Sequence, residues 1–278
     1  MSEAKFYDAH CHIMNLSHPN LLAFLQRLNL PLIMLFAPIL PFLLKRNYNK
    51  IKNLLSVMEN DLGTLFLMME RFLLEDEGLW ENGYLRIGGN LYSKILLTPL
   101  MMDFGYKGRT DPGIYYNLPS QKPIAEQVCD LFNGIRKYTK ESKRKLFEIY
   151  PFLGLNTQNY PLDDETNEKV NQRPNLEQLN EAFSFNGLDK DYYRDLRRFI
   201  HRSPSGLREK LKQRILFGSD FMINLTGAES YNEYLKTFSE SRYFSAEEKD
   251  LFCGVNGGRF LFGESVAKVE VDEEVAVG

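Results

Sequence analysis

Two histidines stand one residue apart near the start of the chain, in the sequence DAHCH at residues 8–12. They end a short, mainly apolar run that predicts a β-strand over residues 5–14. Side chains at positions i and i+2 of a strand point to the same face. His10 and His12 could therefore offer two imidazoles to one divalent ion such as zinc. They could equally be two hydrogen-bonded histidines without a metal, and the motif alone leaves both interpretations open.

A carboxylate follows another short apolar run far along the chain, in the sequence FGSD at residues 217–220. We predict a strand over residues 214–223, which places Asp220 near its carboxyl end. An aspartate there can ligate a metal ion or take a proton from a metal-activated water. The alternative is that Asp220 only caps the next helix.

The remaining chain must position these residues. Further buried strands are predicted at residues 92–104 and 147–156, with helical patterns between the strands, which indicates an α/β architecture with parallel strands. Residues 15–91 are mostly helical by pattern. A capping box, Ser245 with Glu248, predicts a helix start near residue 246. Helices are expected at residues 51–74, 124–138, 176–183, 190–201, 206–213 and 246–252.

Five segments of the chain resemble the metal-dependent amidohydrolase superfamily, in its amidohydrolase-related branch. They are DAHCHIM (8–14), ILLTPLMMDF (95–104), IYPFLGLNTQN (149–159), RILFGSDFMINL (214–225) and NGGRFLFG (256–263). The resemblance implies a (β/α) TIM-barrel-like fold with the HxH pair on its first strand and an aspartate on its last. It also implies that His10, His12 and Asp220 are metal ligands, with Asp220 as ligand or general base. All three fall at the carboxyl ends of strands, where such barrels carry their active sites.

The sequence also departs from that family, whose members take further histidines from the fifth and sixth strands. Only His18 and His201 remain, and we expect His18 in a turn that could reach the site and His201 on a helix surface. Residues 157–213 cannot hold four further βα units of about 30 residues each. We therefore expect one incomplete barrel domain over residues 1–265. It would contain a helical insertion at 15–91 and a shortened, mainly helical region at 157–213, and an acidic tail would follow at 266–278.

Composition excludes several classes of protein. The 278 residues carry 34 basic and 37 acidic side chains, and a pI near 5.9 gives no basic footprint for nucleic acid. Three scattered cysteines argue against a disulfide framework and favour the cytoplasm. Residues 28–44 form an uncharged apolar run, but its three prolines argue against a membrane-spanning helix. We expect a buried hairpin or a lid there.

These observations lead to two functional hypotheses. The first is a metal-dependent hydrolase of the amidohydrolase class, with zinc as the expected ion and Asp220 as proton shuttle. Its substrate would be a small, apolar or aromatic, carbonyl-containing molecule attacked by a metal-activated water. The second is a catalytically inactive relative that serves binding or assembly. The open strand edges of an incomplete barrel would also admit a second copy of the chain, as a homo-oligomer.

Overall fold

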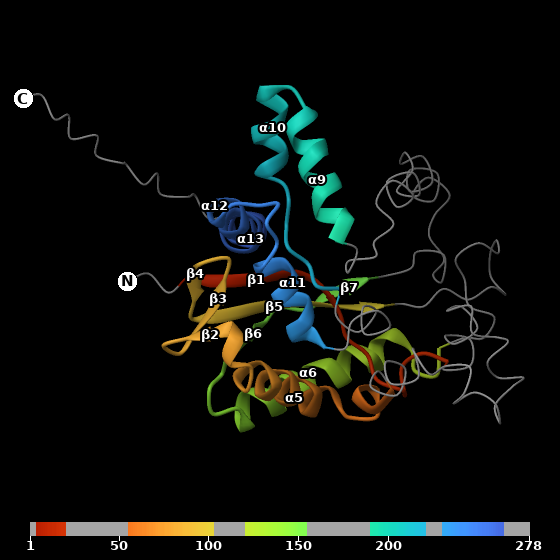
Figure 1. Ribbon diagram of the computed structural model, residues 1–278. Helices are drawn as coiled ribbons and strands as arrows, with labels where there is room; N and C mark the ends of the chain where they lie inside the picture. Colours follow the sequence, from red (N-terminus) through yellow and green to blue (C-terminus); the bar gives the residue numbers. More distant parts are fainter. Residues whose placement is uncertain (1–3, 21–54, 103–119, 155–189, 221–229, 264–278) are drawn as a thin grey trace, which may run out of the picture.

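A sheet of four parallel strands forms the centre of the molecule. The computed structural model describes residues 4–20, 55–102, 120–154, 190–220 and 230–263 (Figure 1). Its strands are β1 (Lys5–His12), β5 (Lys94–Met102), β6 (Phe147–Ile149) and β7 (Phe152–Gly154). The middle strand, β5, pairs with β1 on one side and with both β6 and β7 on the other. The α/β class expected from the sequence is confirmed.

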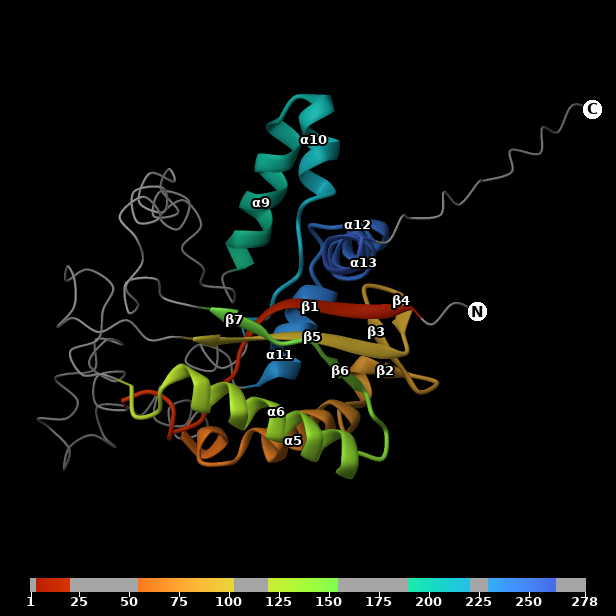
Figure 2. The same ribbon diagram turned by 180° about the vertical axis from the view of Figure 1, so that it is seen from behind.

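Helices cover both faces of this sheet (Figures 1 and 2). Helices α5 (Leu62–Leu74) and α6 (Ile124–Glu141) pack together below it in Figure 1. On the other face, α12 (Ala246–Asp250) runs through the π-helix η4 (Leu251–Val255) into α13 (Asn256–Phe262). Gly257 allows α13 to lie directly on β1, because a Cβ atom at Gly257 would stand 2.4 Å from the Cβ of Tyr7.

Three further helices complete the described fold. Helix α11 (Tyr231–Ser239) packs against α5 and beside the second, smaller sheet. Helices α9 (Lys190–Arg202) and α10 (Ser205–Lys212) form a hairpin that projects from the body of the molecule (Figure 1). The buried ring of Tyr193 on α9 contacts Phe238 and Phe244, so the base of this hairpin joins the core.

An aromatic cluster anchors the segment that leads to Asp220. Phe217 is buried, and its ring lies 5.0 Å from Phe6 and 4.8 Å from Phe238, measured between centroids. Its amide donates to the carbonyl of Phe252, and its carbonyl accepts from the amide of Ala9. Burying an aromatic side chain stabilises a fold by roughly 1.5–3 kcal/mol. Phe217 therefore helps to hold residues 215–220 between β1 and η4.

The strand predictions are partly right. The strand at residues 5–14 is β1, and the one at 92–104 begins at Lys94, since Tyr92 ends a strand of another sheet. The one at 147–156 is divided into β6 and β7 by Tyr150 and Pro151, and proline cannot donate to a ladder. Residues 215–220 are extended beside β1 but form no regular strand. The amide of Ser219, which a parallel ladder would pair with a main-chain carbonyl, donates instead to the carboxylate of Asp8.

Residues 15–91 are predicted to be mostly helical, and the described part of this region also contains a small sheet near its end. After the 3₁₀ turn η1 (Glu77–Leu79), the chain forms an antiparallel sheet of β2 (Trp80–Glu81), β3 (Tyr84–Ile87) and β4 (Asn90–Tyr92). Two-residue turns at 82–83 and 88–89 join its strands. Asn82 and Gly83 have positive φ angles, as do Gly88 and Gly89, and this pattern is typical of tight hairpins.

The helix predictions hold with changed bounds. The predicted helix at 51–74 is interrupted at Asp61, whose side chain caps α5 by accepting from the amide of Thr64. The capping box at Ser245 and Glu248 is present, and the helix it opens runs on through η4 and α13. The predictions at 124–138, 190–201 and 206–213 correspond to α6, α9 and α10.

Several expectations fall outside the described residues: the apolar run 28–44, the helix 176–183, most of the shortened region 157–213, and the acidic tail 266–278. Within the described ranges, the parallel sheet is open and no barrel closes. No helix in those ranges is both long enough and apolar enough to cross a membrane.

Candidate metal centre

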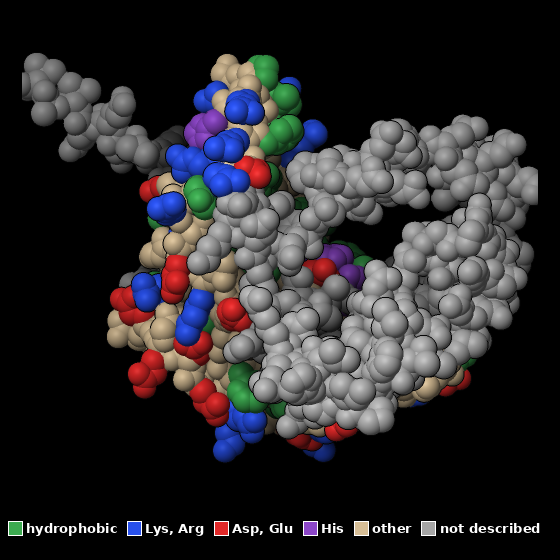
Figure 3. Space-filling view, turned by 45° about the vertical axis from the view of Figure 1, so that its right-hand side comes forward, with side chains coloured by type: hydrophobic (Ala, Val, Ile, Leu, Met, Phe, Trp, Pro, Cys, Tyr) green, Lys and Arg blue, Asp and Glu red, His purple; other side chains and the backbone are tan. Residues whose placement is uncertain are grey.

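The end of β1 and the segment 215–220 bring His10, His12 and Asp220 together. One ligand atom from each of the three lies within 4.8 Å of the others. The Oδ1 atom of Asp220 lies 3.2 Å from Nε2 of His12 and 3.7 Å from Nε2 of His10. Figure 3 views the molecule from this side and shows histidine and acidic side chains next to one another. The three residues that the sequence selected thus form one cluster.

The backbone approaches closely on both sides of this cluster. The amide of Asp220 donates to the carbonyl of His10 at 2.8 Å. Gly218 makes the approach feasible, because a Cβ atom there would lie 2.7 Å from the Cβ of His10. Asp220 itself has a φ of +47°, a left-handed conformation that aspartate adopts more readily than most residues. Residue type is therefore constrained at both positions by the geometry of the site.

Asp8 is the buried support of the cluster. It is fully buried, and its Oδ1 accepts from the amides of Ser219 at 2.8 Å and His10 at 3.4 Å. Its Oδ2 accepts from the hydroxyl of Tyr231 on α11 at 3.0 Å. Burial raises the pKa of Asp8 to about 6, against the effect of these hydrogen bonds. One carboxylate therefore ties β1, the segment before Asp220 and α11 to one another.

Electrostatics leave the two imidazoles neutral near pH 7. Burial lowers the pKa of His10, and burial together with the neighbouring His10 lowers the pKa of His12 to about 4. Burial, and then the nearby Asp8, raises the pKa of Asp220 to about 7. Neutral imidazole is the form that binds metal ions, and a cation would favour the ionised carboxylate.

The donor set fits a divalent ion. The Oδ1 atom of Asp220 is buried and accepts no hydrogen bond, although it faces two imidazole nitrogens. A buried carboxylate oxygen without a donor is costly unless a cation lies beside it. Two ligand atoms at about 2.1 Å from a tetrahedral zinc ion are roughly 3.4 Å apart, close to both observed distances. The Nδ1 atom of His12 is also buried and has no hydrogen-bond partner of ordinary geometry.

The three side chains of the cluster differ in their exposure to solvent. The side chain of His10 is 51% exposed, while those of Asp220 and His12 are 26% and 12% exposed. The site thus has one open side at His10 and one closed side at His12. A small molecule would reach the cluster from the side of His10.

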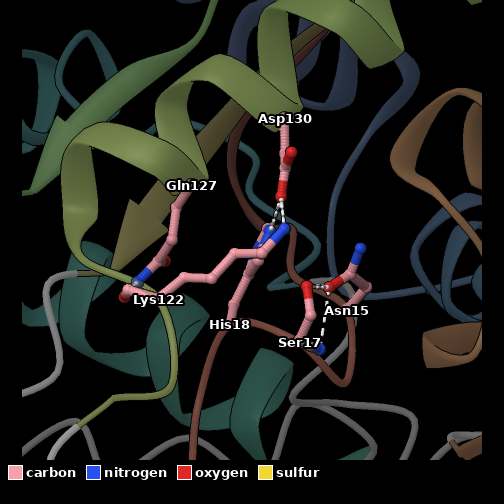
Figure 4. Close-up of polar contacts among 6 residues, drawn as sticks. All are labelled: Asn15, Ser17, His18, Lys122, Gln127 and Asp130. Atoms are coloured by element: carbon pink, nitrogen blue, oxygen red, sulfur yellow. Dashed lines mark hydrogen bonds and ion pairs between the residues drawn. The ribbon is translucent and has the colours of Figure 1, made fainter.

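The other two histidines lie elsewhere. His18 is fully buried, and its Nε2 lies 3.1 Å from Oδ2 of Asp130, to which Lys122 also donates (Figure 4). The expectation that His18 could reach the site from a loop is not met, because this pairing holds it in a separate polar cluster. His201 is exposed in the last turn of α9, as expected for a surface histidine. Cys11 is buried, and burial raises the pKa of its thiol.

Sequence reasoning missed two supporting groups. They are Asp8, two residues before His10, and Tyr231 on α11, whose hydroxyl donates to Asp8. The position of Asp8, two residues before His10, was an available signal for a role on the same side of the strand. No sequence pattern connects Tyr231 to the site, because α11 reaches Asp8 only through the tertiary fold.

Comparison with protein-family models, with curated proteins and with solved structures finds no match. The function of the site is therefore argued from its own geometry.

Proposed function

We propose that the chain is a metal-dependent hydrolase of the amidohydrolase class, built on an incomplete (β/α) TIM-barrel-like fold. The observation that carries the proposal is the convergence of His10, His12 and Asp220 at the carboxyl end of β1. Active sites of parallel α/β folds are found at this end of the strands. The three residues come from two segments far apart in the sequence, which makes an accidental cluster of this composition improbable.

The three ligands would leave one position of a tetrahedral ion open for water or substrate. When bound, a divalent ion such as zinc lowers the pKa of a coordinated water and polarises a carbonyl oxygen. His10 and His12 would contribute neutral imidazole nitrogens, consistent with their lowered pKa values. As a ligand, Asp220 would be ionised, because a bound cation would lower the pKa of about 7 that this carboxyl has without one. As a general base, it would take a proton from the activated water.

The substrate class proposed is a small, apolar or aromatic molecule that contains a carbonyl group. The sequence places many phenylalanine and methionine residues in this chain, and the described core is aromatic around Phe6 and Phe217. The side chain of His10 is 51% exposed, so a substrate could approach the cluster from its side.

A second candidate is a catalytically inactive relative that binds or assembles. One observation favours it: neither His18 nor His201 joins the cluster, so within the described residues no further histidine completes the site. This candidate predicts a chain that binds metal without hydrolytic turnover, or one that binds no metal.

The test is metal content by elemental mass spectrometry on protein purified without a histidine tag. We expect about one zinc, iron or manganese per chain in the wild type and loss of that metal in the His10→Ala/His12→Ala variant. His201→Ala is the matched control, because that histidine is exposed on α9, and it should keep the metal. A wild type without metal after incubation with zinc would overturn the proposal.

The second step separates the enzyme from the inactive relative. Metal-loaded wild type would be screened against aryl esters, anilides and small cyclic amides. Activity that disappears with a chelator, returns with zinc and is lost in Asp220→Asn supports the hydrolase. Full metal occupancy without activity on any of these substrates would favour the binding protein.

A further inference from the structure

A second hollow lies between the end of α10 and helix α13, lined by residues that the metal centre does not use. Its volume is about 400 Å³, within the range of small-molecule sites. Its walls are formed by Gln213, Arg214, Leu216, Asn256, Arg259 and Phe260. Arg214 opens the extended segment whose far end carries Asp220, so the hollow and the metal cluster lie at opposite ends of one short stretch of chain.

The hollow is electropositive. Arg214 and Arg259 are both exposed, and among the described residues neither has an ion-pair partner. The residues that line it include no carboxylate. On the adjoining helices, Glu209 and Glu248 face Lys212, at 3.8 and 3.0 Å. Two guanidinium groups without acidic partners on one concavity favour an anion.

Asn256 is a buried polar residue in the wall of the hollow. It is 1% exposed, and its Nδ2 donates to the carbonyls of Lys212 at 2.7 Å and Ile215 at 2.8 Å. These two acceptors fix which end of the amide is the oxygen. The Oδ1 atom is buried and accepts no hydrogen bond. Through its two donated hydrogen bonds, Asn256 holds the end of α10 and Ile215 against α13 and so shapes the wall of the hollow.

The remaining wall is apolar. Phe260 is 66% exposed, the highest value among the large apolar side chains described, and Leu216 is partly buried beside it. The π-helix η4 ends immediately before Asn256, and such turns often occur at functional sites. A flat apolar group could cover the Phe260 ring while its charged end meets the arginines.

From these observations we propose that the hollow between α10 and α13 binds a small organic anion. The anion would carry a carboxylate or phosphate held by Arg214 and Arg259 and an apolar body against Phe260. This site is independent of the proposed hydrolase function, because none of its residues belongs to the His10, His12 and Asp220 cluster.

Phenyl phosphate is the probe, titrated by isothermal calorimetry into chelator-treated protein so that the metal centre does not compete. Arg214→Gln and Arg259→Gln should each weaken binding roughly tenfold or more. Arg136→Gln is the matched control, since Arg136 lies on the exposed side of α6, and it should bind as the wild type does. Thermal melting of each variant shows that the fold is kept.

Two further arms test the parts of the ligand. Phenol, which lacks the anion, and inorganic phosphate, which lacks the apolar body, should both bind more weakly than phenyl phosphate. Phe260→Ala should reduce the advantage of phenyl phosphate over inorganic phosphate. No binding of phenyl phosphate to the wild type, or equal affinity in wild type and both arginine variants, would overturn the proposal.

Discussion

The carbonyl of His10 accepts a hydrogen bond from the amide of Asp220 at 2.8 Å, while their side chains lie 3.7 Å apart. Two candidate ligands are thus joined through the main chain before any ion is bound. Such a link fixes the direction of both side chains and lowers the ordering cost of ligation. The candidate metal centre is therefore arranged by backbone contacts rather than by long, adaptable side chains.

The close approach of Gly218 to His10 predicts that a side chain larger than that of glycine does not fit at position 218 without a shift of the backbone. Gly218→Ala would push a methyl group to 2.7 Å from the Cβ of His10, so we expect a loss of about 1–3 kcal/mol of stability and lower zinc occupancy. Gly206→Ala is the control, because no atom lies within 4 Å of a Cβ placed there. Urea unfolding and metal content measure both effects. Equal behaviour of the two variants would refute the close approach.

The support given by Asp8 predicts an effect on affinity. Asp8→Ala removes the acceptor that holds Ser219 and Tyr231, so Asp220 should be less well oriented and zinc affinity should fall about 10–100-fold. Tyr231→Phe removes only one of these hydrogen bonds and should cost less. Competition with a chromogenic chelator measures the affinities. A folded Asp8→Ala variant with unchanged zinc affinity would contradict this role.

A buried carboxylate on α5 predicts a loss of stability without a loss of the site. Glu70 accepts from Tyr138, Ser142 and the amide of Leu146, at 3.0, 2.6 and 2.8 Å. Glu70→Ala should cost about 2–4 kcal/mol, because the buried partners lose their acceptor. Metal content per folded chain should stay at the wild-type level, since Glu70 joins α5 to α6 and β6. A Glu70→Ala variant that loses metal but keeps the stability of the wild type would contradict this prediction.

His18 predicts a dependence of stability on pH. Burial lowers the pKa of His18, outweighing the opposite effect of Asp130. A lowered folded-state pKa means that the stabilisation is complete above the ordinary value of 6.5. It is lost as pH falls through the lower folded value. His18→Asn should therefore lose less stability than the wild type between pH 7.5 and 5.5.

Urea unfolding of both proteins with a chelator present gives the comparison. His10 and His12 also titrate, but they are present in both proteins and cancel in the difference. An equal pH dependence in the two proteins would show that His18 is not the group responsible.

The sequence predicted which three side chains come together better than it predicted the strand that carries Asp220. The period of two placed His10 and His12 on one side of β1, and the sequence FGSD placed Asp220 near them. Residues 215–220 do not form the regular strand predicted at 214–223, because the amide of Ser219 donates to the carboxylate of Asp8 instead of to a main-chain carbonyl. That contact depends on the tertiary fold and has no local sequence signal. The role of Tyr231 had no local signal for the same reason.

The small second sheet was predictable and was missed. Asn82-Gly83 and Gly88-Gly89 are hairpin turn pairs with strand-length spacing between them. The helix predicted from the preceding apolar stretch ends at residue 74, and no strand is predicted between it and residue 92, although glycine pairs of this kind indicate turns. The barrel expectation rested on family resemblance, and among the described residues the sheet remains open.

Asp8 and Ser219 are 211 positions apart, which bears on how the chain is made. During synthesis, β1 leaves the ribosome some two hundred residues before the segment that lies along its free edge. For most of that time the outer edge of β1 has no partner, and unpaired edges of apolar strands invite association with other chains. Production of this protein should therefore benefit from slower translation or from chaperones that shield the nascent chain until residue 220 has emerged.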